Sequence, residues 1–241
     1  MSEAPPFWRL VCHDSLVSTS DLCRGAAEAG EAEGMAVLAR QQTGGRGTQG
    51  RHWLSPPGNL YLSVLLRPGG GAGQAGLWGL LAAVALREAA APYLPDLTLK
   101  WPNDVLHRGA KFAGILTEAA AAGEALAWLV LGIGANLRHA PALPDRPTAC
   151  IGPQAPAPEQ FAAGLLARLS YWRERVGREG FTPVLQAWRA HGPAPGAPLS
   201  VQSGVLRQEG RFAGLAETGA LLLATAQGVQ PIMAGEIRCG S

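Results

Sequence analysis

Apolar residues along the chain fall into short runs, separated by segments rich in glycine, proline and charged residues. Short apolar runs with such borders are typical of strands, and longer runs rich in Ala and Leu are typical of helices. The pattern predicts strands at Phe7–His13, Met35–Arg40, Asn59–Arg67, Leu97–Trp101, Lys111–Glu118 and Leu126–Ile133. It predicts helices at Ser18–Gly30, Leu77–Tyr93, Glu159–Glu179 and Phe181–His191.

The segment GPAPGAP, Gly192–Pro198, marks a change in the chain and a domain boundary. Beyond it no helical period remains, and we expect short strands broken by Gly204, Gly210, Gly214, Gly219 and Gly228. About 45 residues are few for independent stability, so this part should pack on the rest. We therefore predict an α+β protein, with a mixed-sheet domain at 1–192 and a small β domain at 193–241.

Composition restricts the function more than the fold. The 241 residues are 47% hydrophobic and 16% charged, which is typical of a folded chain. A net charge of +2 gives no general affinity for nucleic acid or membranes. The N-terminus shows no signal peptide, and the apolar run Ala75–Leu86 is too short to span a membrane. We expect a cytoplasmic protein.

The cysteines and histidines show no metal-binding spacing. Cys12, Cys23, Cys150 and Cys239 form no CxxC pair, and the five histidines form no HExxH motif. We expect inert thiols and no metal held by His or Cys.

One loop carries the strongest chemical signal. Gly45–His52 has the glycine spacing of a Walker A loop, but Arg51 and His52 replace the Lys-Ser/Thr, and a strand follows instead of a helix. This excludes an NTPase P-loop. Glycines still let backbone N–H groups converge on an anion, and Arg46 and Arg51 can neutralise it. Trp53 adds a flat face for a ring.

Three further segments carry polar residues at strand ends. In KWPND, Asn103 offers a donor and an acceptor to a purine, and Asp104 could accept a proton, although an Asx turn would explain both residues equally well. In KFAGILTE, strand geometry predicts that Lys111, Ala113 and Ile115 share one face. LGIGAN lacks the third glycine of a dinucleotide-binding fingerprint, so we expect close backbone approach at Gly134, with Asn136 facing the site.

Together these four segments resemble the biotin–protein ligase family. The stretch QQTGGRGTQGRHWLSPPGNLYLSV is similar to its Gln-x-x-Gly-Arg-Gly-x-x-Gly-Arg-x-Trp signature, and KWPNDV, KFAGILTE and LGIGANL follow in the family's order. The likeness covers nearly the whole chain from about Leu10. It implies a mixed-sheet catalytic domain followed by an SH3-like β domain. Since no helix-turn-helix unit precedes the first strand, the expected form is the one without an N-terminal DNA-binding domain.

The resemblance implies a two-step reaction. Biotin and ATP, with Mg²⁺, would give biotinyl-5′-AMP, which then modifies a lysine of a biotin carboxyl carrier protein. Lys111, Arg46 and Asp104 would be catalytic, with Asp104 assisting deprotonation of the amine. The biotin-binding residues would be Ser18, Thr19, Ser20, Gln42, Arg46, Gly47, Thr48, Lys111 and Gly114. The adenylate would contact Arg46, Arg51, Trp53, Asn103, Lys111 and Asn136.

The sequence departs from the family at Thr48, where Arg is common, at Ser20, where Asn is common, and at Val17, where Asp is common. Without a cation at position 48, we expect the adenylate to leak more readily. A homodimer is a further expectation, as is closure of the glycine-rich loop on binding. The alternatives are a lipoate–protein ligase, a non-catalytic biotin-binding protein, and an octanoyltransferase with a Cys nucleophile.

Overall fold

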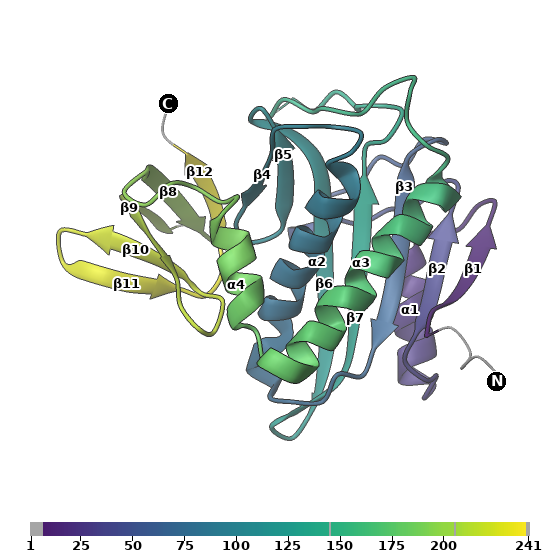
Figure 1. Ribbon diagram of the computed structural model, residues 1–241, viewed down its shortest axis with the longest axis horizontal. Coiled ribbons are helices and arrows are strands. Elements are labelled where there is room, and N and C mark those ends of the chain that lie inside the picture. Colours follow the sequence, from purple (N-terminus) through teal and green to yellow (C-terminus); the bar gives the residue numbers. More distant parts are fainter. Residues whose placement is uncertain (1–6, 145, 205, 240–241) are drawn as a thin grey trace.

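A seven-stranded mixed sheet forms the centre of the larger domain (Figure 1). The computed structural model describes residues 7–144, 146–204 and 206–239, so the first six residues, where no signal peptide is expected, lie outside it. The strand order is β1-β2-β3-β7-β6-β5-β4, and only β1 and β2 pair in parallel. The strands are β1 (Arg9–His13), β2 (Met35–Ala39), β3 (Leu60–Leu66), β4 (Leu97–Lys100), β5 (Asp104–His107), β6 (Ala110–Ala122) and β7 (Ala125–Ala135).

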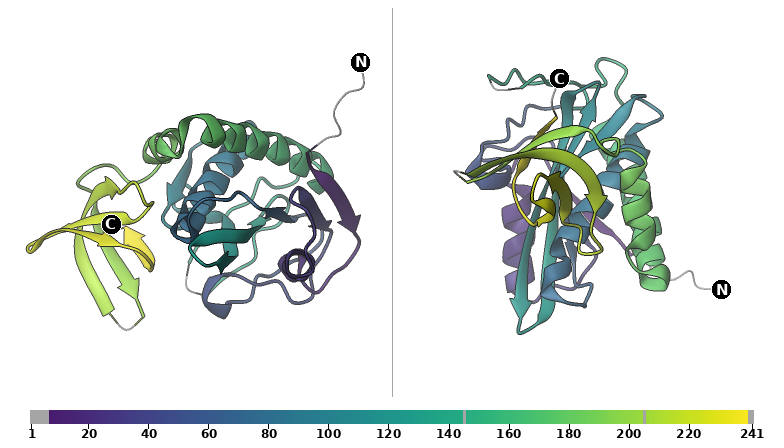
Figure 2. Two further views of the ribbon diagram at one scale, coloured as in Figure 1. Left: turned by 90° about the horizontal axis from the view of Figure 1, so that it is seen from below. Right: turned by 90° about the vertical axis from the view of Figure 1, so that its left-hand side faces the viewer.

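Helices cover both faces of this sheet (Figure 2, left). On one face lie α2 (Ala75–Ala90), α3 (Pro158–Glu179) and α4 (Thr182–Arg189). The helix α1 (Thr19–Glu28) lies on the other face, where Cys23 and Ala27 pack on Val37, Leu65 and Val130. Because α2 is enclosed between the sheet and α3, it is apolar nearly all round.

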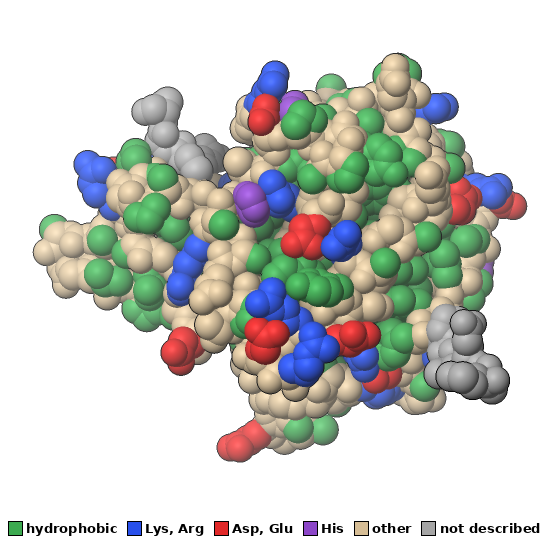
Figure 3. All heavy atoms as spheres, in the orientation of Figure 1, with side chains coloured by type: hydrophobic (Ala, Val, Ile, Leu, Met, Phe, Trp, Pro, Cys, Tyr) green, Lys and Arg blue, Asp and Glu red, His purple; other side chains and the backbone are tan. Residues whose placement is uncertain are grey.

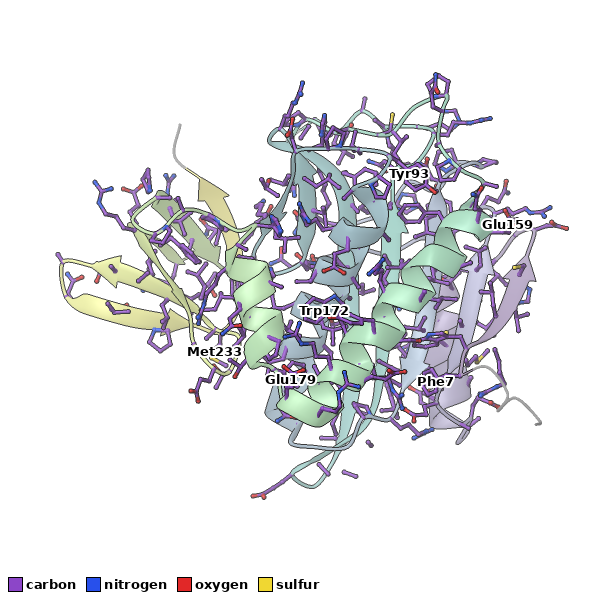
Figure 4. All side chains as sticks on the ribbon, viewed as in Figure 1. Phe7, Tyr93, Glu159, Trp172, Glu179 and Met233 are labelled. Carbon is purple, nitrogen blue, oxygen red and sulfur yellow. The ribbon has the colours of Figure 1, made fainter. Side chains whose placement is uncertain are left out.

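The contact between α2 and α3 includes one polar bridge. The indole Nε1 of Trp172, on α3, donates a hydrogen bond of 3.0 Å to Glu88 on α2 (Figure 4). This hydrogen bond satisfies the indole N–H and adds a directed polar contact to the otherwise apolar packing of the two helices.

Strands β3 and β7 run through the middle of the sheet and are buried on both faces. Such strands carry continuous apolar runs instead of alternating ones, as the sequence LYLSVLL of β3 does. Ser63 is the exception in that run: it is completely buried and faces the side of the sheet that carries α1.

The C-terminal strands form a separate antiparallel sheet in the order β11-β10-β9-β8-β12. Its members are β8 (Pro198–Ser203), β9 (Leu206–Leu215), β10 (Leu221–Thr225), β11 (Gly228–Ile232) and β12 (Glu236–Cys239). The expectation that every glycine here breaks a strand is wrong for Gly210 and Gly214, which both lie inside β9. At Gly210 the neighbouring strand passes so close that a Cβ would come within 2.5 Å of the Ala224 carbonyl.

The small domain packs against one end of the main sheet, beside α4 and β4 (Figure 1). The indole of Trp101 donates a 3.0 Å hydrogen bond to the Gly219 carbonyl, and the rings of Trp188 and Phe212 lie 6.3 Å apart. This part of the contact is therefore apolar with a specific hydrogen bond, which adds to the small core of the short domain.

Several predicted boundaries need correction. The sequence pattern does not predict β5, because the KWPND segment is also typical of a turn that ends a strand. It is instead the turn of a hairpin that pairs Leu97 with His107. Helix α2 begins at Ala75 and ends at Ala90, and β6 continues to Ala122.

The surface over α3 and α4 carries positive and negative side chains side by side, with no extended patch of one sign in this view (Figure 3). In the described part of the chain, no helix is both long and apolar enough to cross a membrane. Cys23 is completely buried, and burial raises the pKa of its thiol to about 12, so this cysteine is inert as expected.

Candidate active site

A cavity opens on the α1 side of the main sheet and is lined by residues of α1, the glycine-rich loop, β6 and β7. Its floor is bare backbone, because Gly114, Gly132 and Gly134 occupy neighbouring positions on β6 and β7. A Cβ on Gly134 would lie 2.6–2.9 Å from the Trp53 indole, and one on Gly132 would collide with the Ser20 hydroxyl. The close approach expected at Gly134 is therefore present, and the glycines create the space. We call this the main cavity.

The closed end of the main cavity is a network of small polar side chains. Ser18 caps α1 by accepting a hydrogen bond from the Asp21 N–H, which places Thr19 and Ser20 over the sheet. The Thr19 and Ser20 hydroxyls lie 2.8 and 3.1 Å from the hydroxyl of Ser63. These groups are buried, so they can offer directed hydrogen bonds to a polar ligand group with little competition from water.

Gln42 connects this network to the glycine-rich loop. Its Oε1 accepts hydrogen bonds from the N–H and the hydroxyl of Thr19, at 2.8 and 3.1 Å. Its Nε2 donates to Ser55, 3.1 Å away. Both ends of the amide are thus fixed, and Gln42 holds the start of the loop against α1.

The loop itself is a small hairpin. The Gly47 N–H donates to the Arg51 carbonyl at 2.7 Å, and the Trp53 N–H donates to Gly45 at 2.9 Å. Its tip is a short 3-10 turn, Thr48–Gly50, with positive φ at Gln49 and Gly50. The hairpin directs Arg46, Gly47, Thr48 and Trp53 into the wall of the main cavity.

Arg46 is held by two carboxylates, which both bind its Nη2. Its Nη2 lies 2.6 Å from Asp21, on α1, and 3.1 Å from Glu118, on β6. Partial burial alone would lower the pKa of Arg46, but the hydrogen bond to Glu118 and the charges of Glu118 and Asp21 raise it above its usual value. Arg46 is therefore a permanent cation at the cavity wall.

Lys111 lies at the centre of the site, but not by the geometry that the sequence suggested. A β-bulge at Phe112 breaks the alternation, since Val105 pairs with Ala113 and Leu106 with Lys111. Phe112, Ala113 and Ile115 all face the α2 core, and Lys111 turns to the opposite face, beside Gly114. The prediction that Lys111 shares a face with Ala113 and Ile115 is wrong, because a bulge re-aims the side chain.

The ammonium of Lys111 has two neighbours. It lies 2.6 Å from Asp104 and 5.4 Å from the centre of the Trp53 ring. Asp104 is buried, so the ion pair fixes the position of the lysine at the boundary between the main cavity and a second one.

The second cavity lies on the other side of Trp53. It is lined by His52, Trp53, Leu54, Lys111, Asn136, Pro141, Leu143 and Thr148. Asn136 is buried and donates to the carbonyls of Lys111 and Ala149, at 3.3 and 3.1 Å. The cavity is mainly apolar with an aromatic wall, a surface that suits a flat ring.

Two residues that were expected to contact the adenylate do not line the second cavity. Asn103 lines the main cavity, and its amide donates to the Ile115 carbonyl at 2.7 Å, so its donor is already used. Arg51 lines neither cavity. It lies on the outer side of the hairpin and pairs with Glu236 of the small domain at 3.1 Å.

Glu236 connects the two domains at the edge of the site. It lies 3.0 Å from Arg146 and 3.6 Å from Lys100, besides its contact with Arg51. Burial would raise the pKa of its carboxyl, but the charges of Arg146, Lys100 and Arg51 outweigh burial and lower it. The small domain therefore contributes a carboxylate to the charged border of the site.

Sequence reasoning missed Asp21, Ser63, Glu118 and Glu236. Only Ser63 gave a local signal, as one polar residue inside an apolar strand. The other three lie in sequence contexts typical of surface positions. Only the tertiary fold brings them next to Arg46 and Arg51. Among the described residues, no group of three or more His, Cys, Asp or Glu could hold a metal ion.

Comparisons with known proteins agree with this arrangement. Residues 18–136 match the Biotin/lipoate A/B protein ligase family, and residues 203–238 match the Biotin protein ligase C terminal domain. A biotin–[acetyl-CoA-carboxylase] ligase of Paracoccus denitrificans is 38% identical over 85% of this chain and 90% of its own length. The bifunctional ligase/repressor BirA of Bacillus subtilis is 33% identical over 96% of this chain and 74% of its own length.

The fold is likewise similar to that of the Aquifex aeolicus biotin protein ligase in complex with biotin and ATP. The TM-score is 0.79 at 26% identity, over 96% of this chain and 99% of the other. Because models of this family match both domains and a biotin–[acetyl-CoA-carboxylase] ligase is 38% identical over most of both chains, this chain belongs to the biotin–protein ligase family.

Proposed function

We propose that this protein activates biotin with ATP and transfers it to a lysine of a biotin carboxyl carrier protein. In the first step a biotin carboxylate oxygen forms a bond to the α-phosphorus of ATP, and the bond from that phosphorus to the bridging oxygen breaks, releasing pyrophosphate. In the second step the lysine amine forms an amide with the biotin carbonyl carbon. AMP leaves with the electron pair, and the amine gives up its proton.

The observation that carries this proposal is the position of Lys111. Its ammonium reaches both cavities, with the polar network at the closed end of one and the Trp53 ring beside the other. A reaction that joins a carboxylate to a phosphate needs a cation where the two anions meet. Lys111 meets that need, and Arg46 adds a second cation at the wall of the main cavity.

We place biotin in the main cavity, with its ureido group at the Ser18–Ser20 end. That group has donors and an acceptor, which the hydroxyls of Thr19 and Ser63 and the amide of Gln42 can match after small rotations. The bare backbone at Gly114, like that at Gly132, leaves room for the rings. Gly47 and Thr48 would close the cavity from the hairpin side.

We place the adenine ring of ATP against Trp53, with Asn136 below it. Mg²⁺ would enter as part of the MgATP substrate, held through phosphates and water, since the described residues form no cage of three ligands. Asn103 would shape the main cavity, and Arg51 would act at the outer side of the hairpin. Asp104 positions Lys111 and remains our candidate for accepting the proton of the amine.

The wider setting is also proposed. We assign the two domains to 1–192 and 193–241. Consumption of ATP favours a cytoplasmic enzyme. A homodimer through β1 is a further proposal, supported by its position at the sheet edge with Val11 exposed, because unpaired edge strands can extend a sheet into a second copy.

The decisive experiment combines the protein with MgATP, biotin and a carrier domain, and measures the carrier by intact mass. One added biotin per carrier is expected, together with release of pyrophosphate. A parallel reaction with lipoate in place of biotin should give no adduct. An unmodified carrier and no pyrophosphate from biotin would exclude the proposed function, and lipoylation would favour the related ligase instead.

A further inference from the structure

The contacts of Arg46 leave part of its guanidinium available. Asp21 and Glu118 both bind Nη2, at 2.6 and 3.1 Å. Among the described residues, Nε and Nη1 of Arg46 form no hydrogen bond. Since the guanidinium is a rigid fork of five donors, two carboxylates can hold one corner while the rest of the fork stays free for an anionic ligand.

Asp21 contacts Arg46 from the first turn of α1. It lies three residues after the N-cap Ser18, the position from which an acidic side chain commonly turns back to the N-cap N–H. Here the carboxylate instead contacts Arg46 and, at 3.0 Å, Arg24. The N-terminal turn of α1 therefore keeps the hydrogen bond made by Ser18, while the carboxylate of Asp21 contacts the hairpin.

Glu118 supplies the second contact from the sheet. It lies on β6, on the same face as Gly114, and its side chain is only 19% exposed, against 37% for Arg46. Together with Arg24 and Arg46, the two carboxylates form a cluster of two positive and two negative charges. The cluster is neutral, so it does not repel an incoming carboxylate as long as Arg46 stays in place.

We propose that Asp21 and Glu118 are positioning residues that hold Arg46, and with it the Gln42–Trp53 hairpin, closed over the main cavity before biotin binds. This rests on the proposed function. A site that is already closed loses less conformational entropy on binding, and its apparent affinity is not reduced by the fraction of open molecules. The two carboxylates act through Arg46 and need not touch the substrate.

The test compares wild type with Asp21→Asn and Glu118→Gln, variants that keep shape and remove one charge each. We expect the KM for biotin to rise about three- to tenfold in each, and further in the double variant, because the open fraction of the hairpin increases. Turnover at saturating biotin, measured by pyrophosphate release, should change less than about twofold, since Arg46 can still reach the bound substrate.

A second measurement needs no ligand. Arg46 and Arg51 are trypsin cleavage sites, so an opened hairpin should be cut faster after these residues, as read by fragment masses. The matched control is Glu179→Gln at the end of α3 (Figure 4), which breaks an ion pair with Arg175 far along the chain from the hairpin. It should leave both KM and cleavage unchanged.

The outcomes separate the two claims. If wild type binds no biotin by calorimetry, the proposed function fails, and the cleavage rates still test the hairpin. If wild type binds biotin and the variants show the same KM and cleavage rate, the positioning role is wrong. A lower KM in the variants would also overturn it, because it would mean that the carboxylates merely compete with biotin for Arg46.

Discussion

The Nζ of Lys111 lies 2.6 Å from the Oδ1 of Asp104, and the two side chains are 15% and 8% exposed. The pair holds the lysine where the two cavities meet, and it exists because of the bulge at Phe112. In a strand of regular alternation, the same lysine would point into the apolar core beside α2. A local defect in the ladder thus creates the central cation of the site.

Lys111→Met should abolish most of the adenylation. A methionine keeps the length of the side chain but removes the charge at the reacting phosphate, so we expect pyrophosphate release to fall about 10²- to 10³-fold. Arg108→Gln is the control, since it removes a cation from an exposed pair with Asp96. A variant at Lys111 that retained a tenth or more of the wild-type rate would be incompatible with this role.

Gly134→Ala should weaken the binding of both substrates, because Gly134 belongs to the floor of the main cavity and lies against Trp53, which lines both cavities. A Cβ at this position would lie 2.6–2.9 Å from the Trp53 indole, and the ring must move away from the wall that it forms. We expect the KM for ATP to rise about tenfold or more, as read in steady-state kinetics. Gly164→Ala on α3 has open space around the new methyl group and should change neither KM. An unchanged KM for ATP would argue against this assignment of the second cavity.

Much of the catalytic geometry followed from the order of four segments. The N-cap at Ser18, the glycine-rich loop and two strand ends were each visible locally, because caps, turns and apolar runs are short-range signals. The predicted ends, Trp101 and Ile133, lie within two residues of the observed ends, Lys100 and Ala135. The likeness to a known family then predicted that these segments meet in one site.

Other features depend on long-range contacts, which local patterns do not encode. Asp21 and Glu118 are ordinary surface residues until α1 and β6 place them next to Arg46. The bulge at Phe112 arises from pairing with β5, a strand that the sequence did not reveal. Glu236 reaches Arg51 only because the small domain packs at the end of the sheet.

Glu236 should make the packing of the small domain depend on pH. Its pKa is lower in the folded protein than in the unfolded chain, so its contribution to stability is complete above the unfolded value of about 4.3 and is lost as the pH falls through the folded value. We expect Glu236→Gln to lower the free energy of unfolding by about 0.5–1 kcal/mol at neutral pH, after allowing for solvent screening.

The difference in the free energy of unfolding between wild type and Glu236→Gln should become smaller below about pH 4.3, as measured by thermal melts. The control, Glu209→Gln, removes an exposed partner of Arg207 in the same domain and should change little at any pH. A gap between wild type and Glu236→Gln that widens on acidification would contradict the assigned direction of the pKa shift.

Thr48→Arg should slow the release of biotinyl-AMP. Thr48 lies in the wall of the main cavity, and an arginine there could add a charge-assisted hydrogen bond to the adenylate. Such a bond is worth about 1.5–3 kcal/mol, so the off-rate should fall at least about tenfold. Gln49→Arg places the same charge at the next position, which lines the groove toward the small domain but not the main cavity. If both variants slow release equally, general charge and not a contact at position 48 is the cause, and an unchanged off-rate in Thr48→Arg would refute the proposed leak.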